Sequence, residues 1–209
     1  MQQDWKEYLA LLRQHPGEAG DMLRTVDDPE LLTAYSEAHG VRLGIVYKSR
    51  WHTLVVDLVR DRAGQLRTYE RLLKTVSGSS VVAIPFHGEK LVLLKQFRHA
   101  LGGYQYCFPR GFAEPGIPPA ENARKELREE LNCQPAEPTL LGQVVADSGI
   151  CGEKVWVFRC DISMPRTDGK YENIEGHMEI TLPELLQMVR SGQINDGFTL
   201  SAIALLQNA

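Results

Sequence analysis

Hydrophobic residues near the start of the chain recur at three- and four-residue spacing. This spacing appears over residues 5–12 and again over residues 29–38, with polar residues at the positions between. Apolar positions three and four apart share one face of a helix, so the pattern predicts two short amphipathic helices. We expect these helices to form an N-terminal extension over residues 1–42.

The pattern changes after the second predicted helix. Residues 52–60 and 66–74 are rich in β-branched and long apolar side chains, and they flank a turn at residues 61–64. Such runs on both sides of a glycine-containing turn are typical of a β-hairpin. We therefore begin the main domain, residues 43–209, with a group of N-terminal strands over residues 43–75.

A second hairpin is predicted in the middle of the chain. Residues 79–86 and 90–98 each contain a run of apolar residues, and Gly88 lies in the short connection between them. Glycine takes a positive φ angle without steric cost, as tight hairpin turns require. The two segments are therefore expected to be adjacent central strands.

Strands and helices are interleaved over the rest of the chain. Residues 140–146 and 154–162 continue the strand pattern, whereas residues 119–131 and 181–190 have helical periodicity. A last helix is predicted over residues 200–206. Interleaved elements of this kind indicate an α/β or α+β domain with a mixed sheet.

Composition and charge narrow the class of protein. Hydrophobic residues make up 43% and charged residues 24% of the 209 residues, which is typical of a globular protein. The formal net charge of −4 gives no electrostatic reason to bind nucleic acid or a membrane surface. The first residues are polar, and nowhere do eighteen apolar residues run together. We expect a cytoplasmic protein with a small substrate.

The cysteines give no sign of a structural framework. The chain has four, none of them in a CxxC pair, at positions Cys107, Cys133, Cys151 and Cys160. Without a secretory signal, such scattered cysteines predict neither disulfides nor a zinc site. We expect reduced thiols in or near the core.

One segment carries candidate chemistry. A loop rich in glycine and proline begins at Gly111 and leads into the helix predicted over residues 119–131, where Glu126, Glu129 and Glu130 fall on one side. Carboxylates crowded near a helix C-terminus repel one another and the helix dipole, and a divalent cation would remove that cost. Mg²⁺ is commonly held by one or two carboxylates with waters and phosphate oxygens. From these residues alone, a solvated acidic face is the alternative.

The whole segment resembles the Nudix box, a pattern of glycine, five residues, Glu, seven residues, Arg-Glu, an aliphatic residue, any residue, Glu-Glu, any residue, glycine and an aliphatic residue. The chain keeps five of its positions, namely Gly111, Glu126, Leu127, Glu129 and Glu130. It departs at four, with Ile117 for the first Glu, Lys125 for the Arg, Asn132 for the second Gly and Cys133 for the last aliphatic residue.

The resemblance gives these departures a meaning. In the family the first Glu and the Arg support each other, so their joint replacement by Ile117 and Lys125 is expected to affect a structural pair rather than catalysis. Asn tolerates the left-handed conformation better than other non-glycine residues, so Asn132 should end the helix as glycine would. The resemblance implies that Glu126, Glu129 and Glu130 bind the metal.

From about residue 46 the chain is similar to the ADP-ribose pyrophosphatase branch of this family. That branch has a Gln-x-Arg on the strand before the box, which implies that Arg98 binds a substrate phosphate. It gives a metal the backbone carbonyl of the residue before the box glycine, here Arg110, and often has an acid where this chain has Cys107. It often stacks an aromatic residue on the base, here Trp51, for which core packing is the alternative.

Water activation and the substrate cleft are assigned by the same resemblance. The branch has a catalytic acid in a late loop, where this chain offers Glu172 and Glu175, and some members use a box glutamate such as Glu129 or Glu130. Both late acids could instead be solvated loop residues. The turn around Gly149 would line the cleft or be a plain hairpin loop.

The sequence thus predicts a Nudix fold, α/β or α+β, with a mixed sheet between helices and N-terminal antiparallel strands. We expect Mg²⁺-dependent, or Mn²⁺-dependent, hydrolysis of the pyrophosphate of a nucleoside diphosphate derivative such as ADP-ribose or a nucleotide sugar. The resemblance also implies a homodimer. A nucleotide-binding sensor or scaffold without catalysis is the alternative, and within the enzyme class capped RNA or a diadenosine polyphosphate is another substrate.

Overall fold

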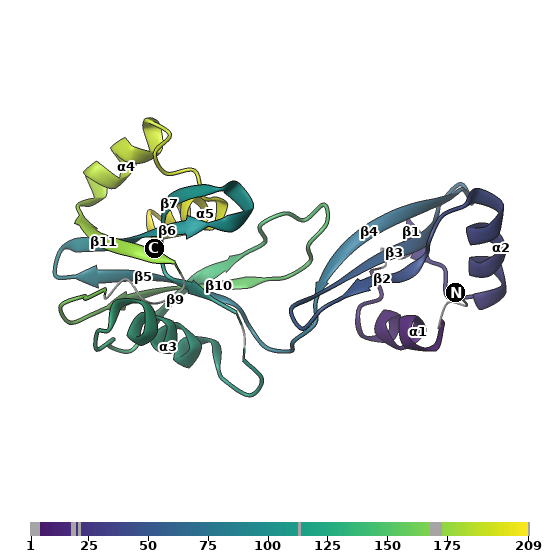
Figure 1. The fold of residues 1–209 in the computed structure, drawn as a ribbon, viewed down its shortest axis with the longest axis horizontal. Helices are drawn as coiled ribbons and strands as arrows, with labels where there is room; N and C mark the ends of the chain where they lie inside the picture. The colour runs from purple at the N-terminus through teal and green to yellow at the C-terminus, as the bar shows by residue number, and fades with distance from the viewer. Residues whose placement is uncertain (1–4, 18–19, 21, 113, 168–172, 209) are drawn as a thin grey trace. The chain divides into compact units, whose positions relative to one another are not determined.

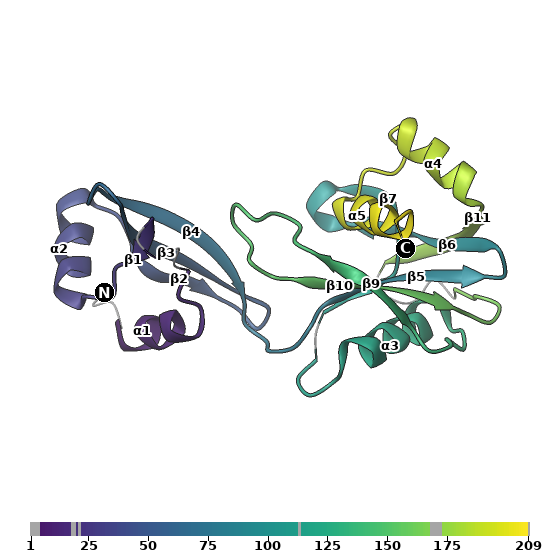
Figure 2. The ribbon, with the colours of Figure 1, turned by 180° about the vertical axis from the view of Figure 1, so that it is seen from behind.

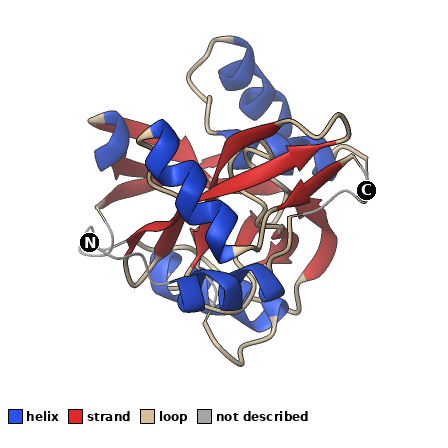
Figure 3. Cartoon of the chain, turned by 90° about the vertical axis from the view of Figure 1, so that its right-hand side faces the viewer, coloured by secondary structure: helices blue, strands red, loops and turns tan. Residues whose placement is uncertain are grey.

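A computed structural model describes residues 5–17, 20, 22–112, 114–167 and 173–208. Its contacts divide the chain into two compact units. The first comprises Met1–Val76 and Asp147–Glu153, and the second comprises Ser77–Ala146 and Lys154–Ala209. Helices and strands are interleaved along the chain (Figure 3). Among the described residues, no helix is long and apolar enough to span a membrane.

The first unit is a four-stranded antiparallel sheet with two helices (Figure 1). Its elements are α1 (Trp5–Gln14), β1 (Leu23–Thr25), α2 (Pro29–His39), β2 (Gly44–Lys48), β3 (His52–Asp61) and β4 (Leu66–Lys74). Strand β3 is central, because β1, β2 and β4 all pair with it. The core is formed where both helices pack on this sheet, through Tyr8, Leu32, Val55 and Leu58.

Both predicted helices and the hairpin of β3 and β4 are confirmed. Strand β1 was not predicted, and it lies inside the segment that we expected to be wholly helical. Three residues are too few to show an alternating pattern, and pairing with β3 defines this strand. The domain boundary expected after residue 42 stays a prediction, while the contacts group β2 to β4 with the two helices.

A buried polar network ties α1 to this sheet. The carboxylate of Asp57, on β3, accepts a hydrogen bond from the Tyr8 hydroxyl at 2.7 Å and forms an ion pair with Arg71 of β4. Arg71 also donates to the backbone carbonyl of His15 at 2.8 Å. Asp57 is 1% exposed. The burial of the Tyr8 hydroxyl, together with the negative charge of Asp57 beside it, raises the pKa of Tyr8 far above its ordinary value.

The second unit is built on a mixed seven-stranded sheet. Its strands are β5 (Val81–His87), β6 (Lys90–Arg98), β7 (Gly103–Cys107), β8 (Arg110–Gly111), β9 (Thr139–Val144), β10 (Val155–Asp161) and β11 (Ile174–Ile180). The order is β11-β6-β5-β10-β9, with β7 paired to β6 and β8 to β5. Strands β5 and β10 are parallel, and the other pairs are antiparallel.

Helices cover both faces of this sheet. They are α3 (Pro119–Leu131), α4 (Leu182–Arg190) and α5 (Gly197–Leu206), with a short 3₁₀ helix at His99–Leu101. Val81 and Ala83 of β5 point into the core beneath α3, whereas Val82 and Ile84 point into the core beneath α4 and α5. Figures 1 and 2 show α3 on one side of the sheet and α4 and α5 on the other. The predicted α+β sandwich is thereby confirmed.

The predicted central strands, the later strands and all three helices of this unit are found. Strands β7 and β8 were not predicted. Strand β8 has two residues, Arg110 and Gly111, and exists because they pair with Val82 and Val81 of β5. This pairing anchors the loop that leads to α3. All four cysteines are free thiols, three of them buried, as expected.

Candidate functional site

The loop before α3 is shaped by its prolines and glycines. The backbone NH of Ile117 donates to the carbonyl of Glu114 at 3.2 Å, and Gly116 between them has a φ of +81°. Proline second and glycine third are the residues that a type II turn favours, and Pro115 and Gly116 occupy those positions. Pro118 then caps the helix, which begins at Pro119.

Helix α3 divides its residues between the core and the site. Ala123, Leu127 and Leu131 are completely buried beneath the sheet, as the predicted apolar stripe requires. The helix ends at Asn132 with a φ of 45° and a ψ of 42°, so the expected left-handed cap is confirmed. Packing the stripe fixes the rotation of the helix and therefore the direction of its acids.

The box glycine is required by the position of one of these acids. A Cβ atom built on Gly111 would lie 1.9 Å from Cδ and 2.0 Å from Oε1 of Glu126, distances that no side chain can adopt. The carboxylate of Glu126 therefore rests directly against the backbone of β8. Glu126 is 6% exposed and Glu130, one turn further along α3, is 3% exposed.

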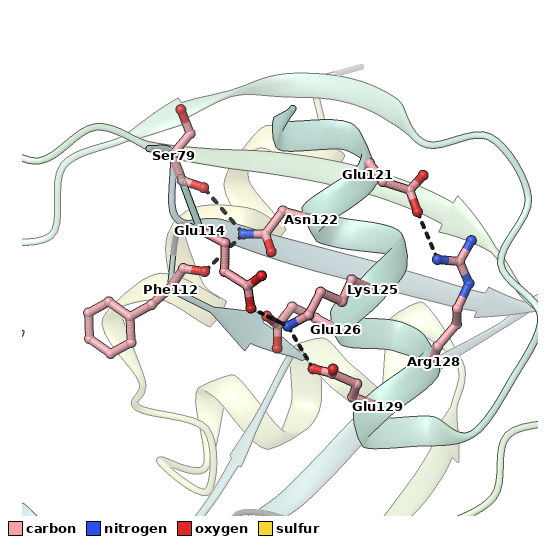
Figure 4. A network of polar contacts seen from close by, with 9 residues as sticks. All are labelled: Ser79, Phe112, Glu114, Glu121, Asn122, Lys125, Glu126, Arg128 and Glu129. Atoms are coloured by element: carbon pink, nitrogen blue, oxygen red, sulfur yellow. Dashed lines mark hydrogen bonds and ion pairs between the residues drawn. The ribbon is translucent and has the colours of Figure 1, made fainter. Parts of the chain in front are cut away.

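Glu129 has a different environment (Figure 4). Its carboxylate lies 3.0 Å from the ammonium of Lys125, which also lies 2.8 Å from Glu114 and 3.8 Å from Glu126. Burial acts to lower the pKa of Lys125, but the hydrogen bonds to Glu114 and Glu129 outweigh it, so the pKa is raised and the lysine stays charged. The structure thus separates a buried pair, Glu126 and Glu130, from a lysine-bound glutamate.

The side chains at this site offer oxygen atoms that could hold a metal ion if further ligands came from outside the protein. Within the described residues, no three His, Cys, Asp or Glu side chains converge to enclose a metal ion. Mg²⁺ needs only one or two carboxylates, because waters and substrate phosphates complete its octahedron. Asn122 adds a buried oxygen one turn before Glu126, and its Oδ1 accepts no hydrogen bond among those residues. The donor set is therefore suited to a hydrated, oxygen-seeking cation.

Two arginines lie near Cys107, and one of them, Arg110, is close enough to Glu130 for their charges to interact. Arg98, at the end of β6, places Nη2 3.5 Å from Sγ of Cys107, and its buried Nε has no hydrogen-bond partner in the described chain. Burial lowers the pKa of Arg110, and the charge of Arg98 lowers it further, while Asp196 and Glu130 act in the opposite direction. Charges from β6, β8 and α3 therefore meet in one small region.

Asp196 completes this region, although the sequence did not identify it as a site residue. Its Oδ1 lies 3.2 Å from Nη1 of Arg110, and its Oδ2 accepts hydrogen bonds from the backbone NH and the hydroxyl of Thr199 at 2.9 and 2.8 Å. Asp196 is thus both the N-cap of α5 and the counter-charge of Arg110. The signal for its capping role was an Asp before an apolar helical run.

Three further predicted site residues, Glu175, Trp51 and Gly149, lie within the described chain. Glu175, on β11, forms an ion pair with Lys95 at 2.6 Å and is about half exposed, and Glu172 lies outside the described residues. Trp51 and Gly149 belong to the first unit. The ring of Trp51 is 43% exposed with the guanidinium of Arg50 4.4 Å from its centre, so the core-packing alternative is wrong.

An α+β domain with clustered acids on a helix, joined to a sheet by a glycine that makes room for one of them, defines a class of hydrolase folds. The NUDIX domain family matches residues 76–177. ADP-ribose pyrophosphatase of Bacillus subtilis is 30% identical over 140 residues, which are 65% of this chain and 75% of that protein. The chain belongs to the Nudix family and is a Nudix hydrolase.

Two further comparisons agree. ADP-sugar pyrophosphatase of Mus musculus is 32% identical over 108 residues, so the match covers 44% of this chain and half the length of that protein. A solved structure of an ADP compounds hydrolase superposes with a TM-score of 0.69 at 19% identity, covering 80% of this chain and 91% of that one. This structural likeness confirms the predicted fold.

Proposed function

We propose that this chain hydrolyses the pyrophosphate linkage of a nucleoside diphosphate derivative of the ADP-ribose or nucleotide-sugar type. The products are a nucleoside monophosphate and the second group as its phosphate. The observation that carries the proposal is the contact of Glu126 with Gly111, which seats a buried carboxylate on the same helix as Glu130, whose charge acts on Arg110 together with that of Arg98. In this proposal the metal-binding acids and the phosphate-binding arginines act on the same substrate.

Glu126 and Glu130 are the principal metal ligands in this proposal, and the backbone carbonyl of Arg110 and the carboxylate of Glu129 complete the set. Bound Mg²⁺, or Mn²⁺, would neutralise phosphate charge and lower the pKa of an attacking water. The burial of Glu126 and Glu130 supports this role, because a buried carboxylate is stable only with a cation or hydrogen-bond donors around it.

Arg98 is the proposed phosphate ligand. Its guanidinium is planar and can donate two parallel hydrogen bonds to phosphate oxygens. The buried Nε without a partner in the described chain supports this assignment, since a phosphate oxygen would satisfy it. Arg110 is held to Asp196, so it contributes positive charge from a fixed position.

Four carboxylates remain candidates for activating the attacking water. A general base must come within hydrogen-bond range of that water. Glu129 and Glu130 lie on the proposed metal-binding helix, whereas Glu175 lies on β11 and Glu172 lies outside the described residues. Replacing each by Gln and comparing turnover at saturating metal would identify the base as the variant with the largest loss.

We propose that two residues of the first unit, Trp51 and Gly149, help to bind the substrate. The exposed ring of Trp51 suits stacking on a base, and the turn at Gly149 is exposed, with its backbone NH and carbonyl hydrogen-bonded to Asp147 and Tyr69. We also propose that the chain works in the cytoplasm as a homodimer, as the family resemblance suggests. Its mass in solution, measured by light scattering, would be twice 23.5 kDa.

The deciding experiment is a panel of nucleoside diphosphate derivatives incubated with the enzyme and Mg²⁺ or Mn²⁺. It should contain ADP-ribose, several nucleotide sugars, a diadenosine polyphosphate and a capped RNA. Metal-dependent release of a nucleoside monophosphate from the first two kinds is the expected result. Tight binding of these compounds without release would instead indicate a nucleotide sensor.

A further inference from the structure

Lys125 connects the loop before α3 to the acids of the helix. Its ammonium lies between Glu114 of the loop, at 2.8 Å, and Glu129 of the helix, at 3.0 Å, with Glu126 at 3.8 Å (Figure 4). One cation therefore has three carboxylates around it. Two of them are proposed metal ligands, and only Glu114 is not.

The position of Glu114 is set by the backbone rather than by chance. Glu114 is the first residue of the turn that Pro115 and Gly116 form, and its carbonyl accepts the hydrogen bond from Ile117 that closes this turn. A closed turn fixes the direction in which the Glu114 side chain leaves the loop. The side chain then reaches back to the helix while remaining 48% exposed.

The lysine has opposite effects on a metal bound nearby. A fixed ammonium orients Glu129 and Glu126, but its charge also competes with a divalent cation for the same oxygens. A third carboxylate on the loop side offsets part of that positive charge. Without the Glu114 carboxylate, Lys125 would keep only the proposed metal ligands Glu126 and Glu129 as partners within this group of four residues.

We propose that Glu114 is a positioning residue that acts through Lys125. By binding the ammonium on the loop side, Glu114 limits its competition with the metal at Glu126 and Glu129. The proposal rests on the proposed metal role of these two acids. It also explains two of the four departures from the box, Ile117 and Lys125, together. Glu114, three residues before Ile117, supplies the carboxylate that Ile117 lacks.

The test compares two substitutions of glutamate by glutamine. Glu114→Gln removes the loop carboxylate, and Glu121→Gln is the matched control, since Glu121 is about as exposed and pairs with Arg128 at 2.8 Å on the same helix. Mn²⁺ binding to each purified protein is followed by electron paramagnetic resonance without substrate. Glu114→Gln should weaken Mn²⁺ binding about fivefold, a size typical of exposed ion pairs, and Glu121→Gln should leave it unchanged.

Two more measurements separate positioning from a merely structural role. The Mg²⁺ concentration for half-maximal activity should rise by the same factor in Glu114→Gln, while kcat at saturating Mg²⁺ stays within about twofold. Lys125→Arg, which keeps the charge, should bind Mn²⁺ as the wild type does. Circular dichroism and the melting temperature verify that all variants are folded.

The outcomes that overturn the proposal are distinct. Equal Mn²⁺ affinity in Glu114→Gln and wild type, an equal loss in Glu121→Gln, or no Mn²⁺ binding by the wild type would each do so. Failure of the proposed function looks different, because there Mn²⁺ binds but no nucleoside diphosphate derivative is hydrolysed.

Discussion

The carboxylate of Glu126 occupies the space that a side chain on Gly111 would fill, with only 1.9 Å between its Cδ and the position of a Cβ. A side chain at position 111 would therefore force the Glu126 carboxylate to move from the backbone of β8. Gly111 is held by pairing with Val81 of β5, and Glu126 by the buried stripe of α3. The contact joins the central sheet to the proposed metal site.

Gly111→Ala should displace Glu126 and lower kcat/KM by about 100-fold or more, since a misplaced charged group commonly has effects of that size. Mg²⁺ titrations of initial rates and of Mn²⁺ binding would measure the loss. Gly176→Ala is the control, because a Cβ there meets no atom within 4 Å. An active Gly111→Ala enzyme with unchanged metal affinity would show that the contact has no role in the site.

Asp196 should show two separable functions. Asp196→Asn keeps an oxygen that can cap α5 but removes the charge opposite Arg110, whereas Asp196→Ala removes both. The free energy of unfolding should fall by about 1–2 kcal/mol only in the alanine variant. Both variants should lose about tenfold in kcat/KM, because Arg110 loses its charged partner. Urea unfolding and steady-state kinetics provide the two readouts, and full activity of Asp196→Asn would contradict the electrostatic role.

The buried network of the first unit is expected to contribute strongly to stability. Asp57→Ala removes the acceptor of Tyr8 and the counter-charge of Arg71, whose side chain is only 15% exposed. Breaking such a pair should cost about 3–5 kcal/mol, measured by urea unfolding followed through tryptophan fluorescence. Glu7→Gln breaks an ion pair between α1 and Lys48 of β2, where both side chains are about half exposed. That control should cost less than about 1 kcal/mol, and equal costs would refute the importance of burial.

The cysteines should differ sharply in their reactivity. Burial raises the pKa of Cys133 and of Cys160 to about 11 and also raises the pKa of Cys107. At pH 7.5 a thiol with a pKa of 11 is ionised in roughly one molecule in three thousand. Burial, Asp147 and Glu153 also raise the pKa of Cys151, but Cys151 is the one cysteine that is not buried. Ellman's reagent should therefore modify Cys151 first in the native protein and all four thiols in urea. Rates for the other three should rise with pH, and fast reaction of more than one thiol at pH 7.5 would contradict the burial.

The local sequence predicted the box helix well. The bounds of α3 agree with the expected ones, because Pro118 and Pro119 favour a helix start and Asn132 takes the left-handed conformation that stops it. Its apolar stripe could be counted from three- and four-residue spacing. In contrast, β8 is defined by pairing with β5, about thirty residues earlier, which no local pattern encodes, and β7 is the short second strand of a hairpin with β6.

The different environments of the three glutamates could not be predicted in the same way. Helical spacing places Glu126, Glu129 and Glu130 on one side, but it gives no information about what faces them. The approach of Gly111 to Glu126 depends on the pairing of β8 with β5, and the contact of Lys125 with Glu114 depends on the loop that turns at Gly116. Only the contact of Lys125 with Glu129, four residues apart on the helix, follows from local spacing. Asp196 reaches Arg110 across 86 positions of sequence, a contact that only the fold creates.

Turnover by the Glu130→Gln variant tests the central claim most directly. Glu130 is buried on α3, close enough to Arg110 for their charges to interact, and glutamine keeps its size while removing its charge. The rate of monophosphate release from the best substrate of the panel, at saturating Mg²⁺, should fall by about 100-fold or more. The circular dichroism spectrum and melting temperature should stay close to those of the wild type. Wild-type turnover by the folded variant would contradict catalysis by metal-bound carboxylates on this helix.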